Sequence, residues 1–208
     1  MKVLLINGSP HEKGCTYTAL AQAAGSLEEA GIATEIAWIG NDPIRGCQAC
    51  RRCSKGGTVR CVYDDVVNEL LEKAAQADGF VIGTPVYYAG ANGALLCVLD
   101  RMFFAGSSAM AFKPGAGVAS ARRAGTVTAI DQVNKYFQIN RMPVVSSNYW
   151  PMVHGSKAED VLQDKEGMQV MRVLGQNMAW MLGCIEAGKQ AGSPIPETEA
   201  KVWTNFIR

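Results

Sequence analysis

The sequence has no excess of either charge and no region of strongly biased composition. Twenty Lys and Arg residues balance nineteen Asp and Glu residues, giving a formal net charge of +1 with both signs interspersed. A protein that binds nucleic acids or acidic membranes usually carries a basic surface, which this balance disfavours. We therefore expect neither a nucleic-acid nor a membrane partner, and the composition favours small-molecule chemistry.

Long hydrophobic runs, linkers and repeats are also lacking. The N-terminal hydrophobic run spans only residues 3–6, which is shorter than the core of a secretory signal. No run approaches the roughly 20 residues that cross a bilayer. We predict one domain over residues 1–208, with a cysteine-rich loop at about 40–63, in a cytoplasmic protein.

Two common phosphate-binding motifs are missing, although the chain has a glycine-containing loop near its start. A Walker loop needs Gly-Lys-Ser/Thr, and a dinucleotide fingerprint needs Gly-x-Gly-x-x-Gly. Instead, the hydrophobic residues 3–6 are followed by the loop Asn7-Gly8-Ser9-Pro10-His11-Glu12-Lys13-Gly14-Cys15-Thr16. Four successive hydrophobic residues are typical of a strand buried on both faces of a parallel sheet.

This first loop leads directly into a predicted helix. Hydrophobic residues recur at three- and four-residue steps from Tyr17 to Leu27, and Gly31 is a stop signal. The unpaired N–H groups at a helix start attract anions, phosphate above all, and Ser9 and Thr16 add hydroxyl donors. An ordinary strand-to-helix turn with a capping residue is the alternative.

Further strands and helices alternate along the chain. We predict strands at 32–39, 79–83, 115–120 and 143–147, with helices between them and a last helix striped by Met168 to Ile185. Such alternation predicts an α/β fold, a doubly wound parallel sheet with helices on both faces. The loops after the first, third and fourth strands should therefore meet in one crevice at the carboxyl ends of the strands.

The loop at 84–90, after the third strand, carries two adjacent tyrosines among small residues. Tyr87 and Tyr88 can lie along a flat heterocycle, and a flavin fits that description. Trp150 can cover the other face of such a ring or belong to a partner subunit. The alternative is that these aromatic residues only cap the end of the sheet.

Four of the seven cysteines lie within fifteen positions. Cys47, Cys50 and Cys53 have the spacing of ligands to a 4Fe-4S cluster, and Cys61 can return, after a segment with Gly56-Gly57, as the fourth thiolate. A zinc site or free, redox-active thiols are the alternatives. Cys97 and Cys184 occur in helical patterns and are expected to be small core residues.

These motifs resemble the flavodoxin-like NAD(P)H-dependent FMN reductases, and more closely their iron-sulfur flavoprotein branch. The resemblance is carried by Gly8-Ser9-Pro10, by Gly83-Thr84-Pro85-Val86-Tyr87-Tyr88 leading to Asp100-Arg101, and by the four clustered cysteines. It implies three layers around a five-stranded sheet of order 2-1-3-4-5. The Asp100-Arg101 pair is either part of that pattern or simply an ion pair.

The resemblance also implies the cofactors and their residues. The first loop would bind the FMN phosphate, and the later loops would flank the flavin ring, while four cysteines would hold the metal centre; no catalytic side chain is expected. Cys15 stands where the family usually has asparagine or serine. The implied FMN-binding residues are Ser9, His11, Cys15, Thr16, Pro85, Val86, Tyr87, Tyr88, Gly90, Asn92, Ser120, Arg122 and Gly125, and the implied metal ligands are Cys47, Cys50, Cys53 and Cys61.

Three functional hypotheses follow from this sequence. The first is an oxidoreductase in which NAD(P)H passes hydride to FMN and electrons continue to a small or protein acceptor. The second is an electron carrier with FMN and a 4Fe-4S cluster that is reduced by ferredoxin. The third is a regulatory protein without a tightly bound cofactor. In the relay, electrons would cross between subunits, as in the proteins that this branch resembles, so we expect a homodimer or homotetramer.

Overall fold

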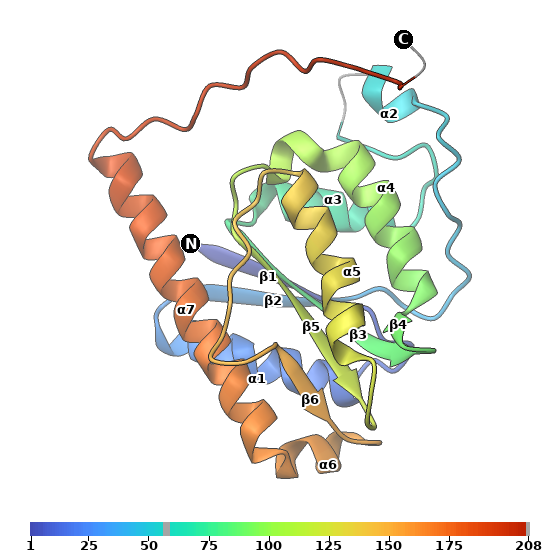
Figure 1. Ribbon diagram of the computed structural model, residues 1–208, viewed down its shortest axis with the longest axis vertical. Helices are drawn as coiled ribbons and strands as arrows, with labels where there is room; N and C mark the ends of the chain where they lie inside the picture. Colours follow the sequence, from blue (N-terminus) through green and yellow to red (C-terminus); the bar gives the residue numbers. More distant parts are fainter. Residues whose placement is uncertain (56–58, 207–208) are drawn as a thin grey trace.

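A computed structural model describes residues 1–55 and 59–206. It contains a parallel sheet covered by helices on both faces (Figure 1). The predicted cysteine-loop residues Gly56 and Gly57, and the last two residues of the predicted domain, lie outside the described part. The strands are β1 (Lys2–Asn7), β2 (Ala33–Trp38), β3 (Gly79–Tyr87), β4 (Gly90–Ala91), β5 (Gly115–Ala121) and β6 (Met152–His154).

The strand order is β2-β1-β3-β5-β6, and every neighbouring pair in this path is parallel. The two-residue β4 pairs antiparallel with the end of β3 and lies off the path. The five parallel strands therefore follow the predicted 2-1-3-4-5 order, and the predicted doubly wound α/β class is confirmed. The short β4 is an addition that the sequence pattern did not reveal.

The last strand lies later in the chain than predicted. Residues 143–147 were expected to form it, but Val144 makes only one parallel bridge, to Gly115. The chain then turns toward the last helix, where Ser147 Oγ donates to the Val170 carbonyl at 2.7 Å and Asn177 donates to the Ser146 carbonyl. These bonds take the place of a strand ladder, and pairing with β5 resumes only at β6.

The helices form two layers, one on each face of the sheet. On one face lie α1 (Cys15–Glu29) and α7 (Lys165–Gln190), and on the other lie α3 (Val66–Gln76), α4 (Gly93–Met110) and α5 (Thr126–Ile139) (Figure 1). Each layer has its own hydrophobic core, because β1 and β3 are buried on both faces. The short helices are α2 (Arg52–Lys55) and α6 (Ala158–Gln163).

Helix α3 begins at a capping residue. Asp65 is its N-cap, and its side chain accepts a hydrogen bond from the Val67 N–H at 3.1 Å. Such a cap stabilises a helix start by about 1 kcal/mol. Its buried residues, including Leu70 and Leu71, form the expected stripe against the sheet.

Helix α4 is long and hydrophobic. Its 18 residues, from Gly93 to Met110, have a mean hydropathy of 1.2, which by length and composition alone would suffice to cross a membrane. Eight of these residues are buried in the protein, among them the charged Arg101. Burial of 44% of the helix in the core is the arrangement of a packed core helix.

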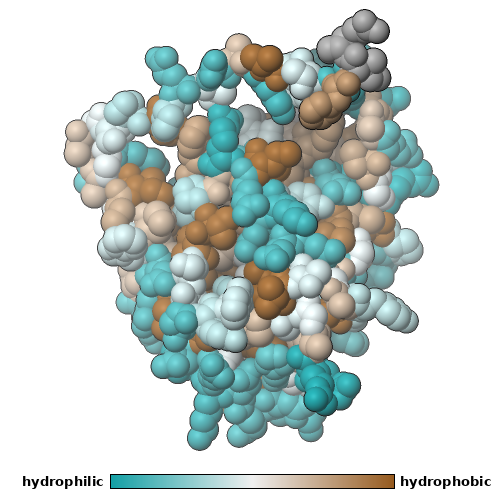
Figure 2. Space-filling model, in the orientation of Figure 1, coloured by the Kyte–Doolittle hydropathy of each residue, from teal (hydrophilic) through white to brown (hydrophobic). Residues whose placement is uncertain are grey.

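One cysteine that was expected in the core lies at the surface instead. Cys184 on α7 is exposed, contrary to the prediction, because it faces away from the sheet, whereas Cys97 on α4 is half-buried. Hydrophobic and hydrophilic residues are interspersed over the face shown in Figure 2. After α7 the chain continues as an exposed tail that runs back across the top of the view (Figure 1), where Arg141 donates a hydrogen bond to the Thr198 hydroxyl at 2.6 Å.

Candidate functional site

A cavity of about 590 Å³ lies at the carboxyl edge of the sheet. It is formed by the loop between β1 and α1, the ends of β3 and β5, and the segment between β6 and α6. The strand register explains this convergence, because Asn7 is paired with Gly83 and Pro85 is paired with Ser120. Nine of the thirteen predicted FMN-binding residues line it: Ser9, His11, Cys15, Thr16, Pro85, Val86, Tyr87, Ser120 and Arg122.

The N-terminus of α1 opens into this cavity. Gly14 is the N-cap and provides no capping side chain, and the first turn contains no acidic residue. The first N–H groups of the helix therefore have neither a side-chain acceptor at the cap nor a nearby carboxylate in that turn to compete with an anion. The Thr16 hydroxyl lies 2.8 Å from the Ser120 hydroxyl, so two elements place hydroxyl groups at one point.

Side chains from the end of β1, from β2 and from the cap of α4 fix the conformation of the loop between β1 and α1. Asn7 donates to the Glu12 carbonyl at 2.9 Å and accepts from the Ser9 N–H at 3.1 Å. The Trp38 indole donates to the Ser9 carbonyl at 2.7 Å, and the Asn92 amide donates to the Gly8 carbonyl at the same distance. The loop is therefore shaped in advance by β1, β2 and α4.

Gly8 is needed because the backbone passes too close to its neighbours for any side chain. Its N–H donates to the Gly83 carbonyl at 2.9 Å. A Cβ at this position would lie 2.6 Å from Leu95 Cδ2 and 2.8 Å from that same carbonyl oxygen. The glycine thus allows β1 to turn into the loop directly beside β3.

Cys15 contributes a thiol to the cavity wall. Its Sγ lies 3.6 Å from the Gly155 carbonyl oxygen. Burial raises the pKa of this thiol, and the nearby carboxylates of Asp160 and Glu159 raise it further. Cys15 is therefore a protonated, weakly donating group at neutral pH.

Four predicted FMN-binding residues do not line the cavity. Tyr88 is fully exposed and has a positive φ of 48°, because it lies in the turn between β3 and β4. Gly90 belongs to β4, and Gly125 caps α5 in the left-handed conformation, where a Cβ would lie 2.7 Å from Ala89 Cα. Asn92 is buried, caps α4 and holds Gly8, so it acts on the cavity through the loop.

The predicted aromatic cover is also absent from the cavity wall. Trp150 and Tyr149 are both half-exposed, and their rings contact each other edge to face with centroids 4.8 Å apart. Tyr87, which is 46% exposed, is the aromatic residue that does line the cavity. Trp150 therefore remains available to a ligand or to another molecule at the surface.

A second, much smaller pocket, of about 20 Å³, is lined by all four clustered cysteines. Cys47 and Cys50 are exposed, whereas Cys53 and Cys61 are half-buried. Among the described residues, no three metal-binding side chains converge closely enough to hold an ion. The loop before Cys53 is also strained, because Ala49 and Arg51 have φ values of 52° and 56°.

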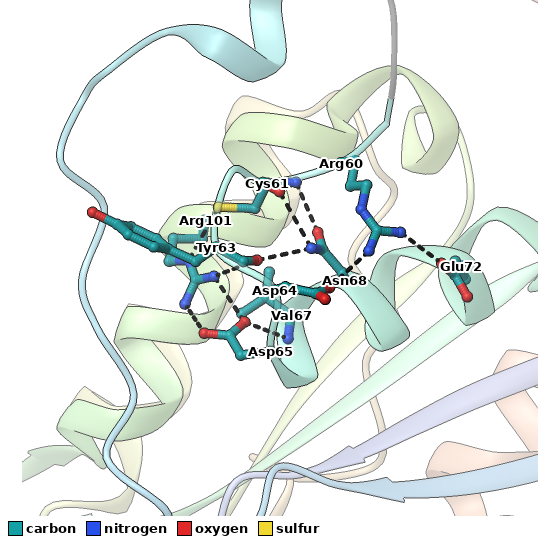
Figure 3. Close-up of polar contacts among 9 residues, drawn as sticks. All are labelled: Arg60, Cys61, Tyr63, Asp64, Asp65, Val67, Asn68, Glu72 and Arg101. Carbon is teal, nitrogen blue, oxygen red and sulfur yellow. Dashed lines mark hydrogen bonds and ion pairs between the residues drawn. The ribbon is translucent and has the colours of Figure 1, made fainter.

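A buried arginine lies beside this cysteine pocket. Arg101 is 2% exposed, and its two terminal nitrogens donate to the Asp65 carboxylate at 2.7 and 2.8 Å (Figure 3). Its Nε donates to Cys61 Sγ at 3.3 Å. Burial opposes the charge, but these bonds with Asp65 and Cys61 outweigh it and raise the pKa of Arg101. Asp100, the expected neighbour, instead accepts a hydrogen bond from Tyr136.

Residues 1–157 match the NADPH-dependent FMN reductase family. The chain belongs to this family. It is similar to an iron-sulfur flavoprotein of Methanocaldococcus jannaschii, with 32% identity over 195 residues that cover 89% of this chain and all of the relative. An iron-sulfur flavoprotein of Archaeoglobus fulgidus is 31% identical, covering 87% of this chain and 97% of its own length.

Solved structures share the fold of this FMN reductase family member. RosB, solved with bound 8-demethyl-8-formylriboflavin-5'-phosphate, aligns with a TM-score of 0.68 at 17% identity, covering all of this chain and 94% of RosB. An archaeal flavodoxin aligns with a TM-score of 0.60 at 13% identity, covering 88% of this chain and 99% of its own. At these identities the comparison shows the flavodoxin-like fold alone.

The residues of the two pockets can be compared with what a flavin and an iron-sulfur centre require. An open helix start, a glycine that permits close backbone approach and a cavity of about 590 Å³ fit a phosphate-bearing flavin. Four thiols around one pocket, with a buried guanidinium bonded to one of them, fit the donor chemistry of an iron-sulfur centre. Binding a cluster would require the exposed thiols to close on it.

The sequence interpretation missed one wall of the larger cavity. Gly155, Ser156 and Lys157, in the segment between β6 and α6, line it together with Glu159 in the first turn of α6. A signal was present in Gly155-Ser156-Lys157, a short flexible, hydroxyl-bearing and basic stretch just before a helix start. It was missed because the last strand was placed at 143–147, and so this segment was not expected beside the sheet.

Proposed function

We propose that this protein, a flavoprotein oxidoreductase by family, binds FMN in the larger cavity and uses it to oxidise NAD(P)H. The observation that carries this proposal is the meeting of the Thr16 and Ser120 hydroxyls beside the uncapped start of α1. Hydroxyl groups and free N–H groups at one helix start form a site for a phosphate dianion. The family and the relatives' names support a flavin as the molecule that carries this phosphate.

The residues of the cavity would bind the two ends of FMN. Ser9, Thr16 and the first turn of α1 would hold the phosphate, with Lys13 adding positive charge and His11 a ring nitrogen at the exposed rim. Pro85, Val86 and Tyr87 at the end of β3 would flank the ring. Arg122, which lines the opposite wall, would place a positive charge where reduction adds negative charge to the ring.

FMN held here would supply the redox chemistry, hydride acceptance from a nicotinamide and electron transfer to a small or protein acceptor. The residues of the cavity would orient the two rings, and this chemistry needs no side chain as a general acid or base. Cys15 is not a candidate nucleophile, because its raised pKa keeps the thiol protonated at neutral pH. We therefore assign no catalytic residue.

An FMN titration followed by stopped-flow reduction tests this proposal. Protein freed of flavin should regain a yellow, protein-bound spectrum with FMN, and riboflavin without the phosphate should bind far more weakly. The bound flavin should then bleach promptly when NADPH or NADH is mixed with it under anaerobic conditions. A colourless protein that does not bind FMN would overturn the proposal and favour a regulatory role.

A second function, electron relay with ferredoxin as the donor, is favoured by the cysteine pocket. Four thiols line this pocket. The alignments with two relatives named iron-sulfur flavoproteins extend over nearly the whole length of those relatives. Cys47, Cys50, Cys53 and Cys61 would hold a 4Fe-4S cluster. Flavin bleaching by reduced ferredoxin but not by NAD(P)H would support the relay, and the reverse result would support the reductase.

The assembly and the compartment are part of the proposal. Three exposed aromatic residues, Tyr88, Tyr149 and Trp150, support a homodimer or homotetramer in which a second copy covers them. The seven cysteines support a reducing, cytoplasmic location. Light scattering coupled to gel filtration would give the oligomeric state, and a monomer at micromolar concentration would contradict the expected assembly.

A further inference from the structure

Arg101 makes a contact that charge balance alone does not explain. A buried guanidinium is costly unless it is paired, and the bidentate contact with Asp65 already pairs it. Two further bonds, to the carbonyls of Arg45 at 3.2 Å and Tyr63 at 3.5 Å, use other N–H groups of the fork. The remaining edge of the guanidinium, at Nε, points at Cys61 Sγ (Figure 3).

Cys61 is fixed by its backbone as well as by its sulfur. The buried Asn68 on α3 accepts from the Cys61 N–H at 2.8 Å and donates to the Cys61 carbonyl at 3.2 Å. The same amide donates to the Tyr63 carbonyl at 2.8 Å, and the Tyr63 ring lies 5.1 Å from the Arg101 guanidinium carbon. Helices α3 and α4 therefore hold Cys61 from two sides.

Two of the other three thiols of the pocket differ from Cys61 in their exposure, whereas Cys53 is half-buried as Cys61 is. Cys47 and Cys50 are exposed on the loop that enters α2. Cys61 is thus a thiol held in place by residues of the core before any metal binds. A metal centre that forms around one prepared ligand needs less ordering of its loop than one built from four mobile ligands.

We propose that Arg101 is a positioning residue that fixes Cys61 as the first ligand of a four-thiolate metal centre and stabilises the negative charge on its sulfur. The inference rests on the metal centre of the second proposed function. A charge-assisted N–H···S bond both orients the sulfur and withdraws electron density from it. In an iron-sulfur centre such a bond raises the reduction potential.

The test compares variants that remove this bond without leaving a buried charge unpaired. Arg101→Gln is combined with Asp65→Asn, because both charges are lost together and asparagine can still cap α3. Arg101→Lys keeps the charge but loses the planar fork. The matched control is Arg60→Gln, which removes a charge next to Cys61 from a side chain that pairs with Asp64 and Glu72 (Figure 3).

The first readout is Co²⁺ binding to reduced, metal-free protein, followed by the thiolate-to-cobalt absorption band. The double variant should bind Co²⁺ 10- to 100-fold more weakly than the wild type, and Arg101→Lys should fall between them. Arg60→Gln should bind as the wild type does. Circular dichroism and thermal unfolding of each variant would establish that the fold is retained.

The second readout is the reduction potential of the centre after anaerobic reconstitution with iron and sulfide. The double variant should show a lower potential than the wild type and than Arg60→Gln, which a purely structural role of Arg101 would not produce. Equal cobalt affinity and equal potential in the double variant and the control would overturn the proposal. A wild type that takes up neither cobalt nor iron would overturn it together with the metal centre, while FMN binding would be unaffected.

Discussion

Thr16 Oγ1 and Ser120 Oγ lie 2.8 Å apart, although 104 residues separate them in the chain. The first residue belongs to the start of α1 and the second to β5, two elements that meet only because β3 lies between β1 and β5 in the sheet. Both side chains are buried, at 1% and 3% exposure. The pair therefore ties the α1 side of the cavity to the strand that forms its far wall.

Replacing Thr16 by valine should weaken FMN binding. Valine keeps the methyl group that packs toward Gly83 but removes the hydroxyl donor. Loss of one hydrogen bond to a charged group corresponds to about 1.4 kcal/mol, or roughly tenfold in Kd. Fluorescence titration with FMN would measure the change. The same substitution at Thr128, exposed on α5, should leave the Kd unchanged, and equal Kd values for Thr16→Val and wild type would contradict the assignment.

Replacing Gly8 by alanine should destabilise the protein and loosen the first loop. The added Cβ would meet both Leu95 and the Gly83 carbonyl oxygen, and the backbone oxygen cannot move aside as a side chain could. We expect a loss of about 1–3 kcal/mol in the free energy of unfolding, measured with urea. Gly25→Ala is the control, because nothing lies within 4 Å of its Cβ and α1 should gain about 0.5–1 kcal/mol. Equal stability of the two variants would contradict this explanation of Gly8.

Replacing Cys15 by serine should tighten FMN binding. The thiol is a weak donor, whereas a hydroxyl at the same place could donate a normal hydrogen bond to the phosphate. We expect the Kd to fall about threefold, which corresponds to a net gain of roughly 0.7 kcal/mol.

The raised pKa of the Cys15 thiol also predicts slow alkylation by iodoacetamide at neutral pH, slower than at the exposed Cys47. Rapid labelling of Cys15 in the FMN-bound protein would argue against its place in the wall.

Glu35 should make stability depend on pH. Hydrogen bonds from Lys2 and then Lys73, each at 2.6 Å, lower the pKa of this carboxyl. A lowered carboxyl pKa contributes stability above the unfolded-state value of about 4.3, and the contribution is lost as pH falls through the folded-state pKa. Glu35→Gln should therefore cost up to about 1 kcal/mol at pH 7 and progressively less at lower pH. Urea unfolding at several pH values would check this, with Glu199→Gln in the exposed tail as the control expected to show no such trend.

Much of the fold follows from local patterns in the sequence. The run at residues 3–6 predicts β1, because a doubly buried strand needs nothing but hydrophobic side chains. The Asp65 cap and the stripe after it predict α3 for an equally local reason. The three residues of β6, by contrast, are too few to form a pattern, and only pairing with β5 makes them a strand.

The site shows the same division between local and long-range information. The spacing of Cys47, Cys50 and Cys53 anticipates that these thiols share one pocket with Cys61. The partner of Arg101 could not be anticipated, because Asp100 is its neighbour in sequence and Asp65 is its neighbour only in space. Long-range pairing of this kind depends on how α3 and α4 pack, which no spacing in the chain encodes.

The indole of Trp38 is an intrinsic fluorescence probe of the first loop. Trp38 donates directly to the Ser9 carbonyl, whereas the other three tryptophans are between 51% and 79% exposed, so we expect their emission to resemble that of an indole in water. Any nucleotide that enters the cavity should therefore quench or shift the shorter-wavelength part of the emission spectrum selectively. Occupancy of the site can then be read from the natural protein, without a label.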